Sequence, residues 1–215
     1  MSLVQLYSAK NSCGFAALIC LEEIGAEYSL NIIDIGRGEQ KEANYLSINP
    51  RGLIPSMIAE GEIITELSGV LTYINSLRKD IELIPDRPLA RAKVYEQLAW
   101  FSTSVHVAIA QIFRGERFSS NPLARETIAQ CGRTRFAAGM DDFEKMASKN
   151  SVWLAGDTFT VIDAVSLVAW RWAERLEMNK ADYPNWHAKV DAAYDRPAVR
   201  RALARESGHE LEYKL

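Results

Sequence analysis

Three features in the first third of this chain have residue types that can do chemistry. Cys13 follows a predicted strand and begins a predicted helix, where free N–H groups and partial positive charge favour a thiolate. The segment from Asn49 to Met57 interrupts an apolar stretch with two prolines and a glycine, and Glu66 follows at a predicted strand-to-helix turn. A thiol, a segment of exposed backbone and a carboxylate could together bind a small peptide.

The second proline of this segment indicates how its backbone could become exposed. Pro55 comes just before a predicted strand at 56–59, and proline is confined to strand starts, edges and bulges because it has no N–H. If the Ile54–Pro55 bond is cis, the N–H and C=O of Ile54 can face outward and pair with an extended peptide as an added strand. The carboxylate of Glu66 could then hold the amino end of that peptide. The alternative is an ordinary loop that leads into a hairpin.

The composition argues against several other classes of protein. The chain has 215 residues, of which 48% are hydrophobic and 25% charged, and its net charge of −3 gives no indication of a nucleic-acid surface. No apolar run approaches the roughly 18–20 residues that span a bilayer, and the first residues lack a secretory signal. The three cysteines, Cys13, Cys20 and Cys131, have no metal-ligand spacing. We therefore expect a cytoplasmic protein without a metal or disulfides.

The elements that must position these residues fall into two groups along the chain. The first 80 residues alternate in the order β-α-β-α-β-β-α, which fits a small sheet with helices on its faces and a parallel second strand. Strands are predicted at 3–7, 28–35, 56–59 and 62–64, and helices at 13–24, within 36–46 and at 65–77. This group is predicted to form an α/β domain that comprises residues 1–80.

No strand pattern follows residue 80. Residues 81–87 predict a linker, and residues 88–215 predict an all-helical domain. Its helices are expected at 90–113, 124–149, 161–177, 186–194 and 197–204. Before the third of these helices, Thr160 and Asp163 have the spacing of a capping box, in which each side chain pairs with the other residue's backbone N–H.

This order of elements and motifs resembles the cytosolic glutathione transferase family over nearly the whole chain. In the first domain the similarity rests on Cys13, on Asn49–Pro55 and on Thr65-Glu66, and in the second on Gly156–Ala164. Cys13 together with His106 is most similar to the bacterial beta class. The resemblance implies a thioredoxin-like N-terminal domain, an all-α C-terminal domain and glutathione as co-substrate.

The resemblance also implies roles for individual residues. Ile54 would pair through its backbone with the cysteinyl unit of glutathione, Pro55 would be cis, and Glu66 would receive the γ-glutamyl ammonium. Cys13 would lie beside the glutathione sulfur, as a hydrogen-bond partner of the thiolate or as a nucleophile that forms a mixed disulfide. A small buried core residue is the alternative for Cys13. Tyr7 and Ser8 are second choices for a catalytic hydroxyl.

Further site residues follow from the same resemblance. Arg37 would bind the glycyl carboxylate, with Lys41 as a rival candidate. His106 would supply a donor or a cation near the thiolate, unless it is a packed residue of its helix. Thr103 keeps a hydroxyl on the helical side of the glutathione site. Leu67 follows the acidic residue where the family often has serine or glycine, so only its backbone N–H can contribute.

The implied function is that of a glutathione S-transferase, which conjugates the glutathione thiolate to small hydrophobic electrophiles in detoxification. We expect a homodimer that binds neither nucleic acid nor membrane. The alternatives are a thiol reductase, dehalogenase or lyase that uses Cys13, and a non-catalytic binding protein, which Leu67, Ala99 and Val107 favour because polar side chains are usual there. The electrophile pocket is expected between the domains, with Phe113, Arg114, Arg117 and Phe118 as candidates for its mouth.

Overall fold

The computed structural model describes residues 4–149 and 152–208, so Leu3, the predicted first residue of the first strand, lies outside the described part. The described residues group into two compact units. One runs to Asp86 and takes up the chain again from Asp191, and the other comprises Arg87–Val190. Sequence order alone suggested that the C-terminal helix belongs to the helical domain, whereas its contacts group it with the sheet. The boundaries at 80 and 88 stay a prediction.

The first unit is built on a sheet of four strands, β1 (Val4–Ser8), β2 (Tyr28–Ile32), β3 (Ser56–Ala59) and β4 (Glu62–Thr65), in the order β2-β1-β3-β4. β2 is parallel to β1, whereas β3 is antiparallel to both β1 and β4. Leu6 in β1 is paired with Leu30 on one side and Met57 on the other. The predicted order of elements and the parallel second strand are confirmed.

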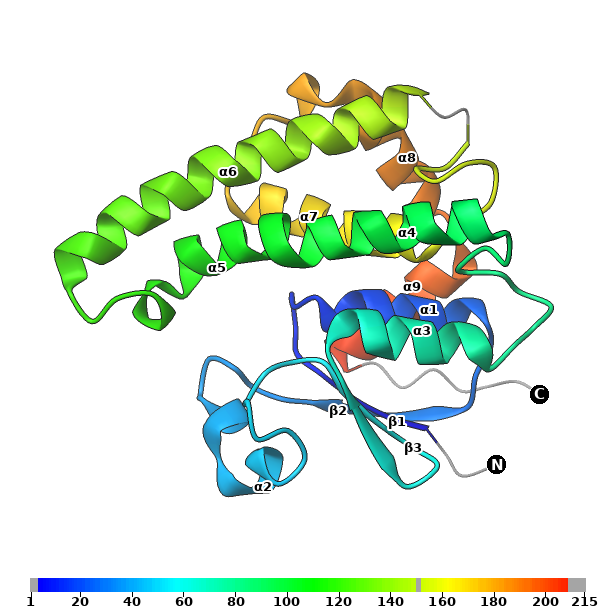
Figure 1. The fold of residues 1–215 in the computed structure, drawn as a ribbon, viewed down its shortest axis with the longest axis horizontal. Coiled ribbons are helices and arrows are strands. Elements are labelled where there is room, and N and C mark those ends of the chain that lie inside the picture. The colour runs from blue at the N-terminus through cyan, green and yellow to red at the C-terminus, as the bar shows by residue number, and fades with distance from the viewer. Residues whose placement is uncertain (1–3, 150–151, 209–215) are drawn as a thin grey trace. The chain divides into compact units, whose positions relative to one another are not determined.

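Helices α1 (Gly14–Glu23) and α3 (Leu67–Ser76) run along one face of this sheet (Figure 1). The short α2 (Ala43–Leu46), which follows a 3₁₀ turn at Glu39–Lys41, and the C-terminal α9 (Pro197–Ser207) complete the unit. Every residue of α1 from Gly14 to Glu22 is buried, because α3, α9 and the sheet pack around it. The large side chains of this core include Leu6, Phe15, Leu18, Ile19, Leu21 and Met57.

The second predicted strand is shorter than expected. It ends at Ile32 instead of residue 35. The Asp34 carboxylate accepts the backbone N–H groups of Gly36 and Arg37, at 2.9 and 3.1 Å. The Asp34 N–H, which lies within the predicted strand, donates to the Glu39 carboxylate at 2.7 Å. A local turn therefore replaces the end of the predicted strand, as is common at aspartate.

A buried carboxylate binds α9 to α1. The Glu22 side chain is only 1% exposed, and its two oxygens lie 2.6 Å from Arg201 Nε and 2.9 Å from Arg205 Nε. The Tyr28 hydroxyl also donates to Glu22, at 2.5 Å. Next to it, Arg196 donates two hydrogen bonds to the Glu23 carboxylate, at 2.5 and 2.7 Å. The positive charge of α9 therefore compensates two acidic residues of α1, of which one has no access to water.

The second unit contains α4 (Pro88–Trp100), α5 (His106–Phe113), α6 (Pro122–Lys149) and α7 (Val161–Arg175), with 3₁₀ turns at Gly115–Arg117 and Lys180–Asp182. α8 (Pro184–Tyr194) begins in this unit. α5 and α6 pack side by side (Figure 1). The predicted helix at 90–113 is interrupted by a π-helical turn, Phe101–Val105, between α4 and α5. Such turns occur often at functional sites.

The predicted capping box at the start of α7 is present. The Asp163 carboxylate accepts the Thr160 N–H at 2.8 Å, while the Thr160 hydroxyl accepts the Ile162 N–H at 3.2 Å. The other Asp163 oxygen accepts the Leu154 N–H at 2.8 Å and so fixes the segment that precedes the helix. Asp163 is buried, and burial raises the pKa of its carboxyl to about 6 although these hydrogen bonds act in the opposite direction.

We predict that Glu22→Gln strongly destabilises the protein. An amide cannot balance the two guanidinium groups, and loss of one partner of a buried ion pair costs about 3–5 kcal/mol. Arg200→Gln is the matched control, because Arg200 of α9 pairs with Asp195 on the exposed surface and exposed pairs contribute little. Urea unfolding of both variants measures the difference. Equal stability of the two variants would contradict the role given to Glu22.

Asp163→Ala is predicted to reduce the free energy of unfolding by about 1 kcal/mol or more at pH 7, as expected for a lost helix cap. The folded protein keeps the Asp163 proton up to a pKa of about 6, above the ordinary value of 3.8. This carboxyl therefore stabilises the folded state increasingly as the pH falls through 6. The difference between wild type and variant should widen by about 2 kcal/mol from pH 7 to pH 4. A difference that stays constant in urea titrations would refute this.

Candidate functional site

The loop from Asn49 to Ser56 is held by buried side-chain hydrogen bonds on both sides of Ile54. The C=O of Leu53 accepts from the Tyr45 hydroxyl at 2.6 Å and from the Asn49 amide at 2.8 Å. The Ser56 hydroxyl lies 2.9 Å from the Tyr45 hydroxyl and 3.2 Å from the Asn49 amide. The Ile54–Pro55 peptide bond is cis, which confirms the prediction. The loop is therefore a fixed structure and not a mobile connection.

The sequence analysis did not predict that Tyr45 helps to build the site, and it gave Asn49 no separate role. Their spacing of four residues places both side chains on one face of a helical turn, and the Asn49 N–H indeed donates to the Tyr45 C=O at 2.9 Å. Polar side chains directly before a proline-rich segment could have indicated that they satisfy its backbone. Gly52 is also required, since its φ is 60° and a Cβ there would lie 2.6 Å from the Gln40 carbonyl oxygen.

Cys13 lies against this loop at the start of α1. Its side chain is buried, and Sγ donates to the Ile54 C=O at 3.5 Å. The pKa of the thiol is raised to about 12, chiefly by burial and to a small extent by the Glu66 charge, whereas a hydrogen bond from the backbone N–H acts in the other direction. The expectation of a thiolate at the helix N-terminus is therefore wrong for this state. Desolvation outweighs the helix terminus, and Cys13 is a neutral thiol at physiological pH.

Glu66 is an exposed carboxylate that immediately precedes α3. Its backbone has φ 64° and ψ 132°, a conformation that non-glycine residues rarely adopt and that costs on the order of 1–3 kcal/mol. Leu67 begins α3 with its side chain in the core, so its backbone N–H is the group that it presents at the helix N-terminus. Cys13 thus contacts Ile54 and feels the charge of Glu66. Binding of glutathione by these residues stays a prediction.

The two rival cations differ in position. The Arg37 side chain is 82% exposed and lies 3.6 Å from Asp34. Lys41 Nζ donates to the Arg51 C=O at 3.4 Å and would be 2.9 Å from a Cβ at Gly52, so it packs against the loop that presents Ile54. This geometry favours Lys41 over Arg37 as the residue next to the loop. Binding by Arg37 stays a prediction.

Tyr7 and Ser8, the second choices for a catalytic hydroxyl, are the last two residues of β1. The Tyr7 hydroxyl donates to Gln5 at 3.3 Å. Ser8 is 1% exposed, and its hydroxyl has no hydrogen-bond partner among the residues that the structure describes. A Cβ at Gly14 would lie 2.3 Å from Ser8 Oγ, so glycine is required there for α1 to pack this closely on β1.

His106 and Thr103 belong to the second unit. The His106 ring stacks on Phe101 and Trp172, with ring centroids 6.2 and 5.4 Å apart. Burial, assisted by the charge of Arg117, lowers the pKa of the imidazole to about 4. The prediction that His106 is a cation is therefore wrong at neutral pH. That its neutral imidazole donates a hydrogen bond near the thiolate stays a prediction. The Thr103 hydroxyl donates to the Ala99 C=O within its own helix at 2.9 Å, and its contact with glutathione also stays a prediction.

Comparisons with known proteins agree with this geometry. Residues 12–77 match the family model "Glutathione S-transferase, N-terminal domain". The chain is 25% identical over 206 residues to Glutathione S-transferase GstA of Escherichia coli O157:H7, covering 94% of this chain and 98% of that protein. A solved glutathione transferase homolog from Sulfitobacter with bound glutathione superposes with a TM-score of 0.89 at 25% identity, covering 98% of this chain and all of the other.

These similarities support a relationship of this chain to the glutathione S-transferase family. The fold is that of a glutathione transferase, with a thioredoxin-like sheet of four strands followed by a helical domain, as predicted. Disulfide-bond oxidoreductase YfcG of Escherichia coli K12 is also similar, at 26% identity over 217 residues and 94% of each chain. Glutathione S-transferases and a thiol oxidoreductase thus occur among the relatives.

Within the described part of the chain, no group of three or more His, Cys, Asp or Glu residues could hold a metal ion. Between residues 4 and 149 and between 152 and 208, no helix is long and apolar enough to cross a membrane.

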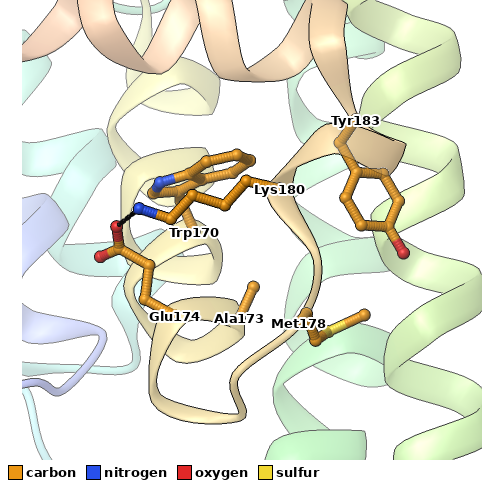
Figure 2. A pocket seen from close by; sticks show the side chains of 6 residues that line it. All are labelled: Trp170, Ala173, Glu174, Met178, Lys180 and Tyr183. Carbon is orange, nitrogen blue, oxygen red and sulfur yellow. Dashed lines mark hydrogen bonds and ion pairs between the residues drawn. The ribbon is translucent and has the colours of Figure 1, made fainter.

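A small hollow in the second unit of the glutathione transferase fold is lined by Trp170, Ala173, Glu174, Met178, Lys180 and Tyr183 (Figure 2). Lys180 pairs with Glu174 at 2.6 Å across its edge, and its Nζ lies 5.8 Å from the centroid of the Trp170 ring. The cavity in it measures about 10 Å³, which is room for roughly one water molecule. Pockets for small ligands usually measure about 300–1,000 Å³, so this one is too small for a typical substrate.

We predict that Cys131 reacts with iodoacetamide at pH 7.5 far faster than Cys13. Cys131 is exposed on α6, whereas Cys13 is buried with a thiol pKa of about 12, and only the thiolate is nucleophilic. Mass spectrometry of tryptic peptides over a labelling time course measures both rates. Labelling of Cys13 as fast as Cys131 in the folded protein would contradict the neutral buried thiol.

Proposed function

We propose that this protein is a glutathione S-transferase that binds glutathione in its first unit and transfers its thiolate to an electrophile. The single observation that supports this most is the convergence of Cys13, Ile54 and Glu66. The Cys13 thiol donates to the C=O of Ile54, and the Glu66 charge is close enough to raise the pKa of that thiol, in a fold whose solved relative from Sulfitobacter contains glutathione.

The binding of the tripeptide follows from the polarity of these groups. The backbone of Ile54 pairs with the cysteinyl unit, and Pro55 closes the bend that presents it. Glu66 accepts the γ-glutamyl ammonium, while the N–H groups at the start of α3, including that of Leu67, attract the γ-glutamyl carboxylate. Lys41 or Arg37 binds the glycyl carboxylate, Lys41 being the one that contacts the loop.

The raised pKa of Cys13 favours conjugation over covalent catalysis by the protein. A neutral thiol is a hydrogen-bond donor, so Cys13 stabilises the thiolate of glutathione and does not itself attack. The glutathione sulfur forms a bond to the electrophilic carbon, and the leaving group departs with its electron pair. The protein contributes by lowering the pKa of the bound glutathione thiol and by holding it near the acceptor.

A thiol–disulfide activity through Cys13 is the second candidate. The similarity to Disulfide-bond oxidoreductase YfcG supports it, and so does the position of Cys13 beside Ile54. A protein that binds glutathione without catalysis is the third, since Leu67, Ala99 and Val107 replace side chains that are usually polar. The burial of the Cys13 thiol is the observation that ranks conjugation first.

The remaining expectations are part of the same proposal. Cys13 and His106 support the beta class within the family, with His106 as a neutral donor and Thr103 as a contact of glutathione. A homodimer in the cytoplasm of a bacterium, with a role in detoxification, agrees with the resemblance and with the use of cysteine in the chain. We retain residues 1–80 and 88–215 as the two domains, although α9 makes its contacts with the first of them.

Isothermal titration with glutathione tests the binding site. Glu66→Gln should weaken binding by about tenfold or more, because a charged acceptor for the ammonium is lost. Glu62→Gln, an exposed acid on neighbouring β4, is the matched control and should bind as wild type does. No binding by the wild type at millimolar glutathione would refute the proposal.

Cys13→Ala separates conjugation from thiol–disulfide exchange. Transfer of glutathione to 1-chloro-2,4-dinitrobenzene should largely survive, while reduction of the glutathione mixed disulfide of 2-mercaptoethanol should be absent from the variant. Cys131→Ala is the control for loss of a thiol elsewhere. Turnover of neither substrate by wild type that binds glutathione would favour the non-catalytic candidate.

A further inference from the structure

The last turn of α9 contains a buried acid. Glu206 is the penultimate residue of this helix and is only 5% exposed. A carboxylate is disfavoured at this place for two reasons, because burial removes it from water and because the C-terminal end of a helix carries partial negative charge. The local stability of α9 therefore does not explain an acid at this position, and the explanation has to come from its tertiary contacts.

The Glu206 carboxylate accepts a hydrogen bond from the turn that precedes Cys13. Its Oε1 lies 3.2 Å from the backbone nitrogen of Asn11, although the two residues are 195 positions apart in the chain. Both belong to the first unit, in which α9 packs against α1 (Figure 1). Asn11 has a φ of 57°, a left-handed conformation that asparagine tolerates better than most residues do. α9 thus holds a turn whose backbone has an uncommon conformation.

Ser12 connects this turn, Ala9–Ser12, to the first residue of α1. The Ser12 hydroxyl donates to the Ala9 C=O at 2.7 Å and accepts the Gly14 N–H at 3.1 Å. The Ser12 N–H also donates to the Ala9 C=O, at 3.2 Å. Cys13 lies between Ser12 and Gly14 in the chain, so a shift of the turn is transmitted directly to the backbone of Cys13.

α9 is a fixed support for this contact. Arg201 and Arg205 pair with the buried Glu22 near the end of α1, whereas Glu206 binds the turn before its start. Loss of the Glu206 carboxylate would therefore leave α9 attached to α1 through the arginine pairs and would release only the turn. A side chain that acts in this way preserves the geometry of a neighbouring site.

We propose that Glu206 is a positioning residue for the candidate site. By holding the Asn11 N–H it fixes the turn that precedes Cys13, and so it keeps the Cys13 thiol on the C=O of Ile54. This inference rests on the proposed function, in which Cys13 donates a hydrogen bond to the sulfur of bound glutathione. A loose turn would move this donor away from the sulfur while the groups that bind the rest of the tripeptide stay in place.

Alkylation of the cysteines by iodoacetamide tests the hold on the turn. Glu206→Met removes the acceptor and keeps the length of the side chain, whereas Glu206→Gln keeps an acceptor oxygen. Cys13 should react about tenfold faster in the Met variant than in wild type, the factor expected when a local opening is opposed by one hydrogen bond less. The Gln variant should keep most of the protection. Cys20, which is buried in the middle of α1, reports unfolding of the helix and should react as in wild type.

Ser207→Ala is the matched control, because Ser207 is the next residue of α9, is exposed, and donates its hydroxyl to the Leu203 C=O of its own helix at 2.9 Å. It should leave the reaction rates of both cysteines unchanged. An unchanged rate at Cys13 in Glu206→Met would overturn the inference. Equal increases at Cys13 and Cys20 would also overturn it, because they indicate a general loss of stability.

The pKa of the bound glutathione thiol, measured from the ultraviolet absorbance of the thiolate, tests the consequence for the site. It should be higher in Glu206→Met than in wild type by about half a unit or more, as expected for one lost hydrogen bond. The Kd of glutathione should change by less than about twofold. A raised Kd with an unchanged pKa would overturn the positioning role, because it indicates a lost binding contact.

The two measurements separate this inference from the proposed function. Absence of glutathione binding to wild type would overturn the proposed function, and the labelling of Cys13 relative to Cys20 would then still decide whether Glu206 holds the turn. Binding of glutathione to wild type, together with equal labelling of Cys13 in wild type and Glu206→Met, would leave the proposed function standing and overturn the role of Glu206.

Discussion

The hydrogen bonds that converge on the Leu53 carbonyl are the constraint on which the candidate site depends. Tyr45 and Asn49 both donate to this oxygen, and both also contact the Ser56 hydroxyl just beyond the cis peptide bond. The backbone on each side of Ile54 is thereby fixed, β3 begins in register with β1 and β4, and β4 leads to Glu66. Buried polar groups must be satisfied, so the same bonds that close the loop decide where Ile54 meets Cys13.

Burial favours the neutral form of two site residues for which the sequence suggested a charged form. A cysteine at a helix N-terminus predicts a thiolate, and His106 was expected to supply a donor or a cation, but burial shifts the pKa of both groups so that their neutral forms are favoured at pH 7. In each case the cost of removing a charge from water is the largest contribution. The charge of the reacting sulfur therefore belongs to glutathione in the proposed mechanism, and the protein supplies donors around it.

The sequence predicted those elements whose signals are local. Pro55 and Gly61 delimit β3 and its hairpin, and Thr160 and Asp163 mark the start of α7. The cis bond at Pro55 was implied by the family resemblance and not by local signals alone. Features that depend on tertiary packing could not be predicted in this way. The π-helical turn within the expected helix at 90–113 is one, and another is the pairing of Glu22 with arginines almost 180 residues away. The desolvation of Cys13 belongs to the same group, because no local pattern reports burial.

The pairing of α9 with α1 has a consequence for the order in which the chain can fold during synthesis. All four strands and α1 leave the ribosome well before the arginines that compensate Glu22 and Glu23. A nascent chain that ends before Pro197 lacks both the helix that covers this side of α1 and the arginines that compensate Glu22. Although most of the first unit is synthesised first, its native packing is completed last, when α9 emerges. The packing around the thioredoxin-like sheet and α1 therefore includes a helix from the far end of the chain.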